Sequence, residues 1–480
     1  MKQLSIDIET RSNIDIGKAG LYRYAQSDDF KILLFAYRFK DDAVQIVDLE
    51  QGEKIPDEVV AALKDPETVK HAYNAAFEWY CLNRAGYETP LEQWRCTMIH
   101  GLYCGYTAGL DATGKAIGLP QDKRKLATGK ALIRYFCVPC KPTKSNGNRT
   151  WNLPRHAPEK WELFKEYCRQ DVVTESEILR RLDAFPVPDE EEKLWQMDIR
   201  MNAFGVKVDT ALIDGALQVN EQSTALLENE ARKLTGLENP NSSAQLLNWV
   251  HENGVEMENL QKATVSEKLS AELPENVRRA LEIRQQLGKT SIKKYVAMDT
   301  AKGPDDRVRG LTQYYGANRT GRWAGRLVQM QNLPRNYIKT LDYARKLVKE
   351  RNYAGIKLLY GNVPDTLSQL IRTAFIPSEG NKFVVADFSA IEARVIAWLA
   401  GETWVNEVFA THGKIYEATA SQMFHVPIEK IAKGNPEYAL RQKGKVATLA
   451  LGYQGGSNAL IAMGALNMGL TEEELPDIVQ

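Results

Sequence analysis

The sequence has no surplus of either charge, because 62 lysines and arginines balance 62 aspartates and glutamates over 480 residues. Proteins that bind nucleic acid usually carry a basic surplus, so the overall balance counts against that class. An enzyme that binds DNA with basic residues and Mg²⁺ with carboxylates would have separate basic and acidic regions. A net charge of zero is therefore compatible with such an enzyme. The length suffices for two to four domains, each with its own core.

Cysteine is also scarce, and the six cysteines lie within the first 168 residues in no regular framework. Cys137 and Cys140 form an isolated CxxC without the further cysteines or histidines that a four-ligand zinc site requires. We therefore predict free thiols in a reducing compartment. Residues 1–7 do not resemble a signal peptide and no apolar run reaches about 18 residues, which predicts a soluble intracellular protein.

Residues 383–398 combine an apolar run, a single carboxylate and apolar residues at helical spacing. The pattern predicts a buried strand over 383–386 that places Asp387 at its end, then a tight turn and a helix. Fixed backbone at a strand end can hold a carboxylate in place as a metal ligand. A simpler interpretation is that Ser389 and Glu392 form a capping box, but this leaves the preceding aspartate unexplained.

This stretch resembles motif A of the family A DNA polymerases (DNA polymerase I-like), whose pattern is Asp-Tyr-Ser-x-Ile-Glu-x-Arg. Residues 387–394 read Asp-Phe-Ser-Ala-Ile-Glu-Ala-Arg, with phenylalanine in place of tyrosine. The resemblance implies that Asp387 binds the catalytic Mg²⁺ ions. It also implies that Glu392 lies beneath the incoming sugar and excludes a 2′-hydroxyl.

Two acidic residues lie close together near the N-terminus. A strand predicted over residues 4–10 carries Asp7 and Glu9, and the alternation of side chains along a strand puts both carboxylates on one face. Two such groups repel each other unless a cation lies between them. On its own, Asp-x-Glu is more typical of a solvent-exposed sheet edge. Its interpretation as a metal site depends on segments later in the sequence.

Glu78 follows a predicted strand-to-helix transition, and Tyr167 and Asp171 share one helical face. With Asp7 and Glu9, they resemble in order and separation the motifs of the DEDD 3′→5′ exonucleases, tyrosine subtype. The resemblance implies that the four acids hold two Mg²⁺ or Mn²⁺ ions about 4 Å apart and that the tyrosine orients the attacking water. The second-motif acid is normally aspartate, so Glu78 departs from the pattern. An RNase H-like fold with decayed catalysis is the alternative.

The middle of the chain carries two further similarities to the polymerase family. Residues 240–246 resemble its thumb pattern, Pro-x-Ser-x-x-Gln-Leu. A mostly polar helix predicted over 275–298 carries Lys289, Lys293 and Lys294, spaced to follow a phosphate backbone without reading sequence. A solvated lysine face is the competing interpretation.

Residues 320–322 (Thr-Gly-Arg) and 331–334 (Gln-Asn-Leu-Pro) resemble the palm signature, Thr-Gly-Arg followed by Gln-Asn-Ile-Pro. The resemblance implies inspection of the DNA minor groove. Arg322 and Gln331, with Asn332 beside them, can donate to the acceptors that every base pair presents there.

Arg441, Lys445, Leu449 and Tyr453 recur every four residues and so line one side of a predicted helix. They resemble motif B, Arg-x3-Lys-x3-Phe-x3-Tyr-Gly, although leucine replaces the aromatic residue. The resemblance implies that this helix binds a dNTP, with its phosphates on the two cations. Tyr416 stands where a phosphate-contacting histidine is common. An amphipathic core helix with basic ends is the alternative.

Motif C, a His-Asp-Glu hairpin, does not occur before Gln480, so we expect the polymerase site of this chain to be half built. The predicted domains are an RNase H-like exonuclease domain (1–186), palm-proximal helices (187–232), a thumb (233–300), a palm (301–400, with an insert at 336–368) and fingers (401–480).

The predicted protein is therefore an α/β and α+β multidomain, phage-type DNA polymerase with a proofreading exonuclease, which replicates (pro)phage DNA in the cytoplasm of a bacterial host. Its predicted partners are primer–template DNA, single-stranded 3′ ends and dNTPs, with two Mg²⁺ or Mn²⁺ ions at each active site and no membrane. One alternative is an exonuclease with a DNA-binding polymerase remnant. Another is half of a split polymerase that needs a second polypeptide carrying motif C.

Overall fold

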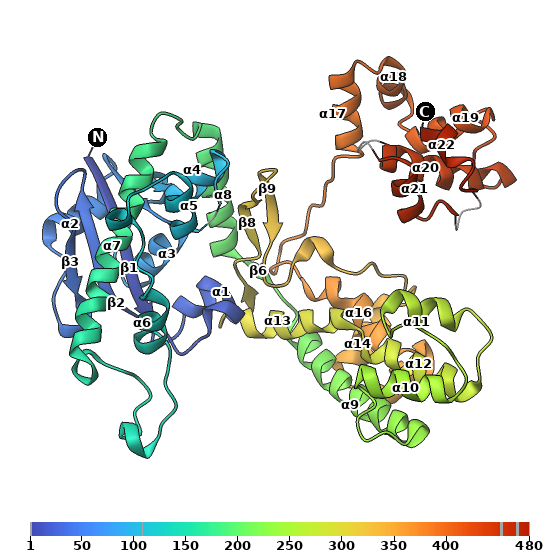
Figure 1. Cartoon of the computed structure of the whole chain (residues 1–480), viewed down its shortest axis with the longest axis horizontal. Coiled ribbons are helices and arrows are strands. Elements are labelled where there is room, and N and C mark those ends of the chain that lie inside the picture. The colour runs from blue at the N-terminus through green and yellow to red at the C-terminus, as the bar shows by residue number, and fades with distance from the viewer. Residues whose placement is uncertain (1, 108, 452–454, 467–469, 480) are drawn as a thin grey trace. The chain divides into compact units, whose positions relative to one another are not determined.

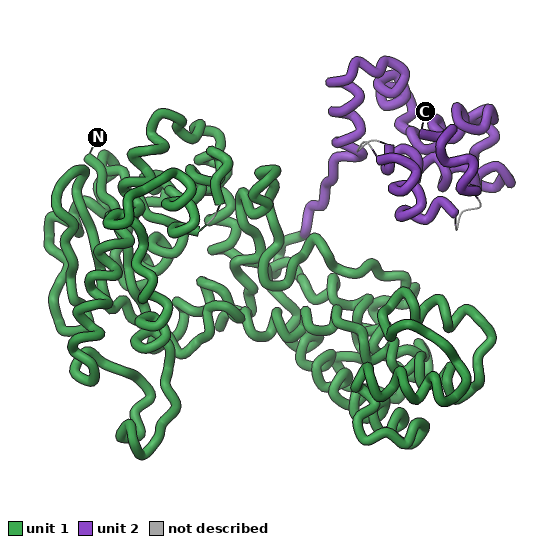
Figure 2. Tube along the Cα trace, viewed as in Figure 1, with its two compact units in different colours: residues 1–382 green, residues 383–480 purple. Residues whose placement is uncertain are grey.

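The computed structural model describes residues 2–107, 109–451, 455–466 and 470–479. The chain divides into two compact units, residues 1–382 and 383–480 (Figure 2). The first unit contains a mixed sheet followed by a helical region, and the regular elements described in the second unit are all helices. No described helix is long and apolar enough to span a bilayer.

The first unit begins with a sheet that carries β1, β2 and β3 (Figure 1). It has five strands, in the order β3-β2-β1-β4-β5. Its strands are β1 (Lys2–Arg11), β2 (Lys31–Phe39), β3 (Gln45–Asp48), β4 (Thr68–Ala72) and β5 (Trp94–Cys96). The β1–β2 and β2–β3 pairs are antiparallel, whereas β4 runs parallel to β1 and β5 parallel to β4. This order and these directions are those of an RNase H-like sheet, which confirms the predicted fold class.

Seven α-helices accompany the sheet in the part of the chain that the structure describes. They are α1 (Ile16–Ala25), α2 (Asp57–Lys64), α3 (Ala76–Arg84), α4 (Thr97–Tyr103), α5 (Leu110–Ala116), α6 (Gly129–Phe136) and α7 (Pro158–Leu182). Phe136 of α6 packs on Trp161 and Phe164 of α7, with ring centroids 4.8 Å and 5.5 Å apart. This buried aromatic cluster fixes α7 against β2, whose Leu33, Leu34 and Ala36 belong to the same core.

Side chains alternate along β1 as the sequence predicts. Leu4, Ile6 and Ile8 are buried in a core shared with α3 and with α8 (Asp189–Phe204). The residues between them point to the opposite face of the strand, where Cys168 of α7 contacts Asp7. The alternation therefore puts the carboxylates of β1 under α7.

The rest of the first unit is mainly helical. Its helices after α8 are α9 (Thr210–Thr235), α10 (Ser243–Glu252), α11 (Lys262–Leu269), α12 (Glu275–Leu287), α13 (Lys293–Ala301), α14 (Leu341–Lys349), α15 (Tyr353–Tyr360) and α16 (Val363–Leu370). Two short pairs of strands join them, β6 (Val206–Lys207) with β7 (Arg307–Val308) and β8 (Thr312–Ala317) with β9 (Arg322–Gly325). The predicted continuous helix over 275–298 is wrong: it is interrupted after Leu287, where glycine, a poor helix former, follows.

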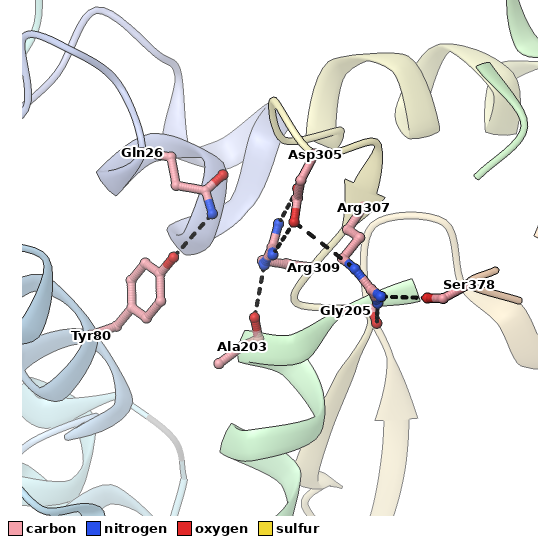
Figure 3. A network of polar contacts seen from close by, with 8 residues as sticks. All are labelled: Gln26, Tyr80, Ala203, Gly205, Asp305, Arg307, Arg309 and Ser378. Atoms are coloured by element: carbon pink, nitrogen blue, oxygen red, sulfur yellow. Dashed lines mark hydrogen bonds and ion pairs between the residues drawn. The ribbon is translucent and has the colours of Figure 1, made fainter. Parts of the chain in front are cut away.

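Residues 305–309, which include strand β7, tie the end of α8 to the helical region (Figure 3). Arg309 donates to the carbonyl of Ala203 at 2.7 Å and pairs with Asp305 at 2.6 Å. Arg307 donates to the carbonyl of Gly205 at 3.0 Å. These bonds satisfy carbonyl groups at a helix end, where no intrahelical partner exists.

Asp209 joins α9 to α14. Its carboxylate caps α9 by accepting from the backbone N–H of Leu212 at 3.1 Å. The same group pairs with Arg345 at 2.7 Å and with Lys349 at 2.6 Å, and its side chain is only 9% exposed. The predicted insert at 336–368 therefore contributes ion pairs to the core around α9.

The second unit contains α17 (Ile391–Ala400), α18 (Thr403–Thr411), α19 (Ile415–Phe424), α20 (Leu440–Leu451), α21 (Ser457–Ala462) and α22 (Leu475–Val479). The strand predicted over 383–386 is wrong, since these residues have no regular structure and Val384 and Val385 are 84% and 90% exposed. An apolar run becomes a strand only when a neighbour pairs its backbone, and no described strand does so. The alternative interpretation, a capping box that begins at Ser389, does not match the structure, because Ala390 occupies the N-cap of α17 and no side chain caps this helix.

Asp209→Ala should lower the free energy of unfolding by about 3 kcal/mol, since it removes a helix cap and leaves two cations without their partner. Urea unfolding followed by tryptophan fluorescence measures the loss. Asp15→Ala is the matched control, because Asp15 also caps a helix, α1, but its side chain is 59% exposed. An equal loss in the two variants would contradict this role for Asp209.

Candidate active sites

Three carboxylates meet between the sheet and α7. Asp7 and Glu9 of β1 and Asp171 of α7 each have an oxygen within 4.8 Å of the others. Glu9 and Asp171 are buried and Asp7 is partly buried. The fold thus brings together Glu9 and Asp171, which lie 162 positions apart in the sequence. The sequence motifs had suggested that they belong to one site.

Glu78, in the first turn of α3, is buried beside this cluster without belonging to the tight group of three. Burial and then the charge of Asp7 raise the pKa of Glu78 well above its usual range. Among the described residues, no group hydrogen-bonds to Glu78 Oε2 or to Asp171 Oδ1, although both atoms are buried. Buried carboxylate oxygens without partners are costly, so the donor set fits hard divalent cations, which prefer oxygen ligands.

Burial raises the pKa values of all three carboxyl groups, and the neighbouring negative charges add to the rise for Asp7 and Glu9. Burial, then repulsion from Asp171, raises the pKa of Asp7 to about 8. Burial, then the charges of Asp7 and Asp171, raises the pKa of Glu9 well above its usual range. The pKa of Asp171 is raised mainly by burial, and the ammonium of Lys125 acts against that rise. The cluster therefore disfavours its own ionisation until cations neutralise it.

Tyr167 lies one turn before Asp171 on α7, with its ring stacked on Phe164 at 6.2 Å. Burial and then Asp171 raise its pKa, so the hydroxyl stays protonated and can donate a hydrogen bond. Gly129 lies against this ring, since a Cβ at that position would come within 2.0 Å of it. Only glycine leaves the tyrosine in this position.

Three neighbours of the cluster were not predicted from the sequence. Cys168 donates to Asp7 Oδ2 at 3.4 Å, and Glu175 is buried one turn beyond Asp171 and hydrogen-bonds to Thr97. Their spacing from Asp171 on one helix was the available signal. Lys125, which forms an ion pair with Asp171, lies on a loop and belongs to no motif.

The second unit holds the residues predicted to bind nucleotide. Arg441, Lys445 and Leu449 lie on α20, whereas Tyr453 falls outside the described residues. Arg441 donates to Glu417 Oε1 of α19 at 2.8 Å. Its guanidinium lies 5.3 Å from the centre of the Tyr416 ring. The structure therefore brings the predicted phosphate ligands Arg441 and Tyr416 together.

The two carboxylates of the predicted motif A lie in the same unit. Asp387 is exposed within the irregular segment before α17. Glu392 is partly buried in the first turn of that helix. Their roles in metal binding and sugar discrimination stay predictions.

The residues predicted to contact DNA differ in their surroundings. Lys289 pairs with Asp365 at 2.5 Å, and Lys294 donates to the carbonyl of Val328 at 2.5 Å. The others lie at the surface: Arg322 at the start of β9, Gln331 and Asn332 in a short 3₁₀ turn, and Lys293 at the start of α13. Lys289 and Lys294 would have to break that ion pair or hydrogen bond to reach a ligand.

The chain is similar to known DNA polymerases. A family model described as DNA polymerase family A matches residues 213–472. A DNA polymerase of Bacillus phage SP02 is 58% identical over the whole chain, which covers 74% of that protein. DNA polymerase I of Borreliella burgdorferi is 25% identical over 58% of this chain, but the match covers only 27% of that protein.

Solved structures that share the fold include the POL domain of Pol1 from M. smegmatis in complex with DNA primer-template and dNTP. The TM-score is 0.59 at 17% sequence identity, and the match covers 99% of this chain and 71% of that one.

Asp7→Asn should raise the melting temperature in metal-free buffer above pH 8 by several degrees. The pKa of Asp7 rises from 3.8 to about 8 on folding, so the folded state holds this proton more tightly and wild type loses stability as pH rises through that range. The gain should vanish below about pH 4. Melting curves from about pH 3 to 9 measure it, and Mn²⁺ should stabilise wild type more than the variant.

The matched control is Asp41→Asn, at a carboxylate that is 79% exposed. It should leave the pH profile unchanged. A melting temperature of Asp7→Asn that stays at or below that of wild type at pH 9 would contradict the electrostatic interpretation.

Proposed function

Because the chain belongs to DNA polymerase family A, we propose that it catalyses template-directed DNA synthesis and removes mismatched 3′ ends at a separate exonuclease site. The observation that carries the polymerase assignment is 58% identity to a phage DNA polymerase over the entire chain. The carboxylate cluster around Asp7 carries the exonuclease assignment. The setting would be the replication of phage DNA in a bacterial cytoplasm.

At the exonuclease site, Asp7, Glu9 and Asp171, with Glu78 beside them, would hold two Mg²⁺ or Mn²⁺ ions. Bound there, these ions would supply the charge that activates water and stabilises the leaving oxygen. The protonated hydroxyl of Tyr167 would orient that water, and its position one turn before Asp171 on α7 supports this role. Burial of the cluster excludes bulk water and strengthens each of these interactions.

At the polymerase site, Asp387 would be a metal ligand, and Arg441 and Lys445 would bind the triphosphate of the dNTP. Arg441 would exchange its bond to Glu417 for the phosphates, because a guanidinium binds carboxylate and phosphate alike. The remaining residues of the proposed nucleotide site are Glu392, Tyr416, Leu449 and Tyr453.

Primer–template DNA would lie against the first unit. Arg322, Gln331 and Asn332 would inspect the minor groove, and Lys293 would contact the phosphate backbone. Lys289 and Lys294 would join it only after giving up their present partners. The fold is shared with a polymerase domain solved with primer-template DNA and dNTP, which supports this class of ligand.

An exonuclease with a DNA-binding polymerase remnant is a second candidate. One observation favours it: the acids of the first unit are assembled and are buried or partly buried, whereas Asp387 lies in an exposed segment outside any described strand. The comparisons give no support to a second polypeptide. The predicted domain limits remain proposals. The boundary between the two compact units falls after residue 382, inside the predicted palm.

Asp7→Ala should lower Mg²⁺-dependent degradation of a single-stranded oligonucleotide by at least about 100-fold, as expected when an active site loses a charge-stabilising group. Primer extension by the same variant should be unchanged. Asp387→Ala should show the reverse pattern, with extension lost and degradation intact. Gel assays of 5′-labelled substrates measure both activities.

Degradation that persists in Asp7→Ala would contradict the exonuclease assignment. If wild type degrades DNA but does not extend a primer, the second candidate replaces the first. Melting curves of both variants in EDTA check that each remains folded.

A further inference from the structure

We propose that Lys125 contacts the phosphodiester at the 3′ end of the strand being degraded, and is thus a further catalytic residue of the exonuclease site. This inference rests on the proposed exonuclease function. It starts from the position of a basic side chain that no motif of the sequence had indicated.

Lys125 lies just beyond a short 3₁₀ turn, Gln121–Lys123, and reaches the centre of the site. Its ammonium forms an ion pair with Asp171 and lies 4.6 Å from the centre of the Tyr167 ring. Its side chain is 28% exposed, so it is held in the wall of the site rather than free in solvent. One cation therefore touches both a proposed metal ligand and the proposed water-orienting residue.

A cavity of about 900 Å³ adjoins this point and is lined by both Lys125 and Tyr167. Its volume lies within the range of pockets that bind small ligands. Three more basic residues line it, Lys115, Arg124 and Lys130. Lys115 is paired with Asp111, which also lines the cavity. The remaining basic groups give the cavity a positive wall that suits a nucleotide phosphate.

The sequence around Lys125 is segregated in charge. Residues 123–158 contain nine lysines and arginines and no aspartate or glutamate, in a chain whose net charge is zero. This segment includes α6 and the loops on either side of it. Local concentration of positive charge is the electrostatic footprint of a nucleic-acid contact. Lys125 is the member of this segment that reaches the carboxylates.

The chemistry gives the ammonium a second partner. Negative charge on the phosphoryl group must be stabilised during its transfer. Divalent cations held by the carboxylates would neutralise the charge of Asp171, which Lys125 otherwise balances. The four-carbon stem of lysine is flexible and carries three donors, so the ammonium can turn from Asp171 to the adjacent phosphate. In a purely structural role, Lys125 would stay on Asp171 and never contact substrate.

The test compares two single-stranded oligonucleotides that differ only in the 3′-terminal linkage, a charged phosphodiester or a neutral methylphosphonate. Binding to the full chain is measured by fluorescence anisotropy with Ca²⁺ in place of Mg²⁺, and gels check that the DNA stays intact. Lys125→Met should weaken binding of the phosphodiester oligonucleotide about tenfold, the scale of one charge-assisted hydrogen bond. It should leave binding of the methylphosphonate oligonucleotide within twofold of wild type.

Two further variants sharpen the result. Lys125→Arg should recover most of the lost affinity, because it restores a cation. Lys123→Met removes a charge from the adjacent 3₁₀ turn at a residue that does not line the cavity, and should affect both oligonucleotides equally. Melting curves of Lys125→Met check that the variant is folded.

Equal weakening of both oligonucleotides by Lys125→Met, or weakening of neither, would overturn the proposal. If wild type still degrades single strands with Mg²⁺ in that case, only the role of Lys125 fails. If wild type neither binds nor degrades single strands, the exonuclease assignment itself fails.

Discussion

Repulsion among Asp7, Glu9 and Asp171 is the constraint around which the first unit is built. The side-chain alternation of β1 presents two of these carboxylates to α7, and the aromatic packing of α7 prevents the third from moving away. Carboxylates held this close in a buried site favour protonation or a cation. The folded state therefore includes repulsion among these carboxylates, and bound divalent ions would reduce that repulsion.

The neutral composition of the chain conceals this segregation of charge. Acids collect between β1, α3 and α7, while residues 123–158 carry only basic charges. Lys125 belongs to the basic segment and contacts the acidic cluster, so it joins the two regions. In the second unit, the Arg441–Glu417 pair repeats the pattern on a smaller scale. Each proposed site pairs a cation with a carboxylate, and in the proposed function a bound ligand would separate that pair.

Local periodicity predicted the parts of the structure that depend on neighbours in sequence. The strand that carries Asp7 and the helix that carries Tyr167 and Asp171 follow from patterns of two and of four residues. The apolar run at 383–386 showed the limit of that reasoning, because pairing between strands depends on distant residues. The partner of Lys289 could not be predicted either, since Asp365 lies 76 residues away. Lys125 was missed for the same reason: a loop, placed by tertiary packing, carries it to the site.

Anomalous diffraction from crystals soaked in Mn²⁺ tests the central claim most directly, because it locates the ions without relying on activity. The account predicts two peaks about 4 Å apart, in contact with Asp7, Glu9 and Asp171, and an ammonium of Lys125 that has left Asp171. A difference map without peaks at these carboxylates, with the Lys125–Asp171 ion pair intact at millimolar Mn²⁺, would contradict it.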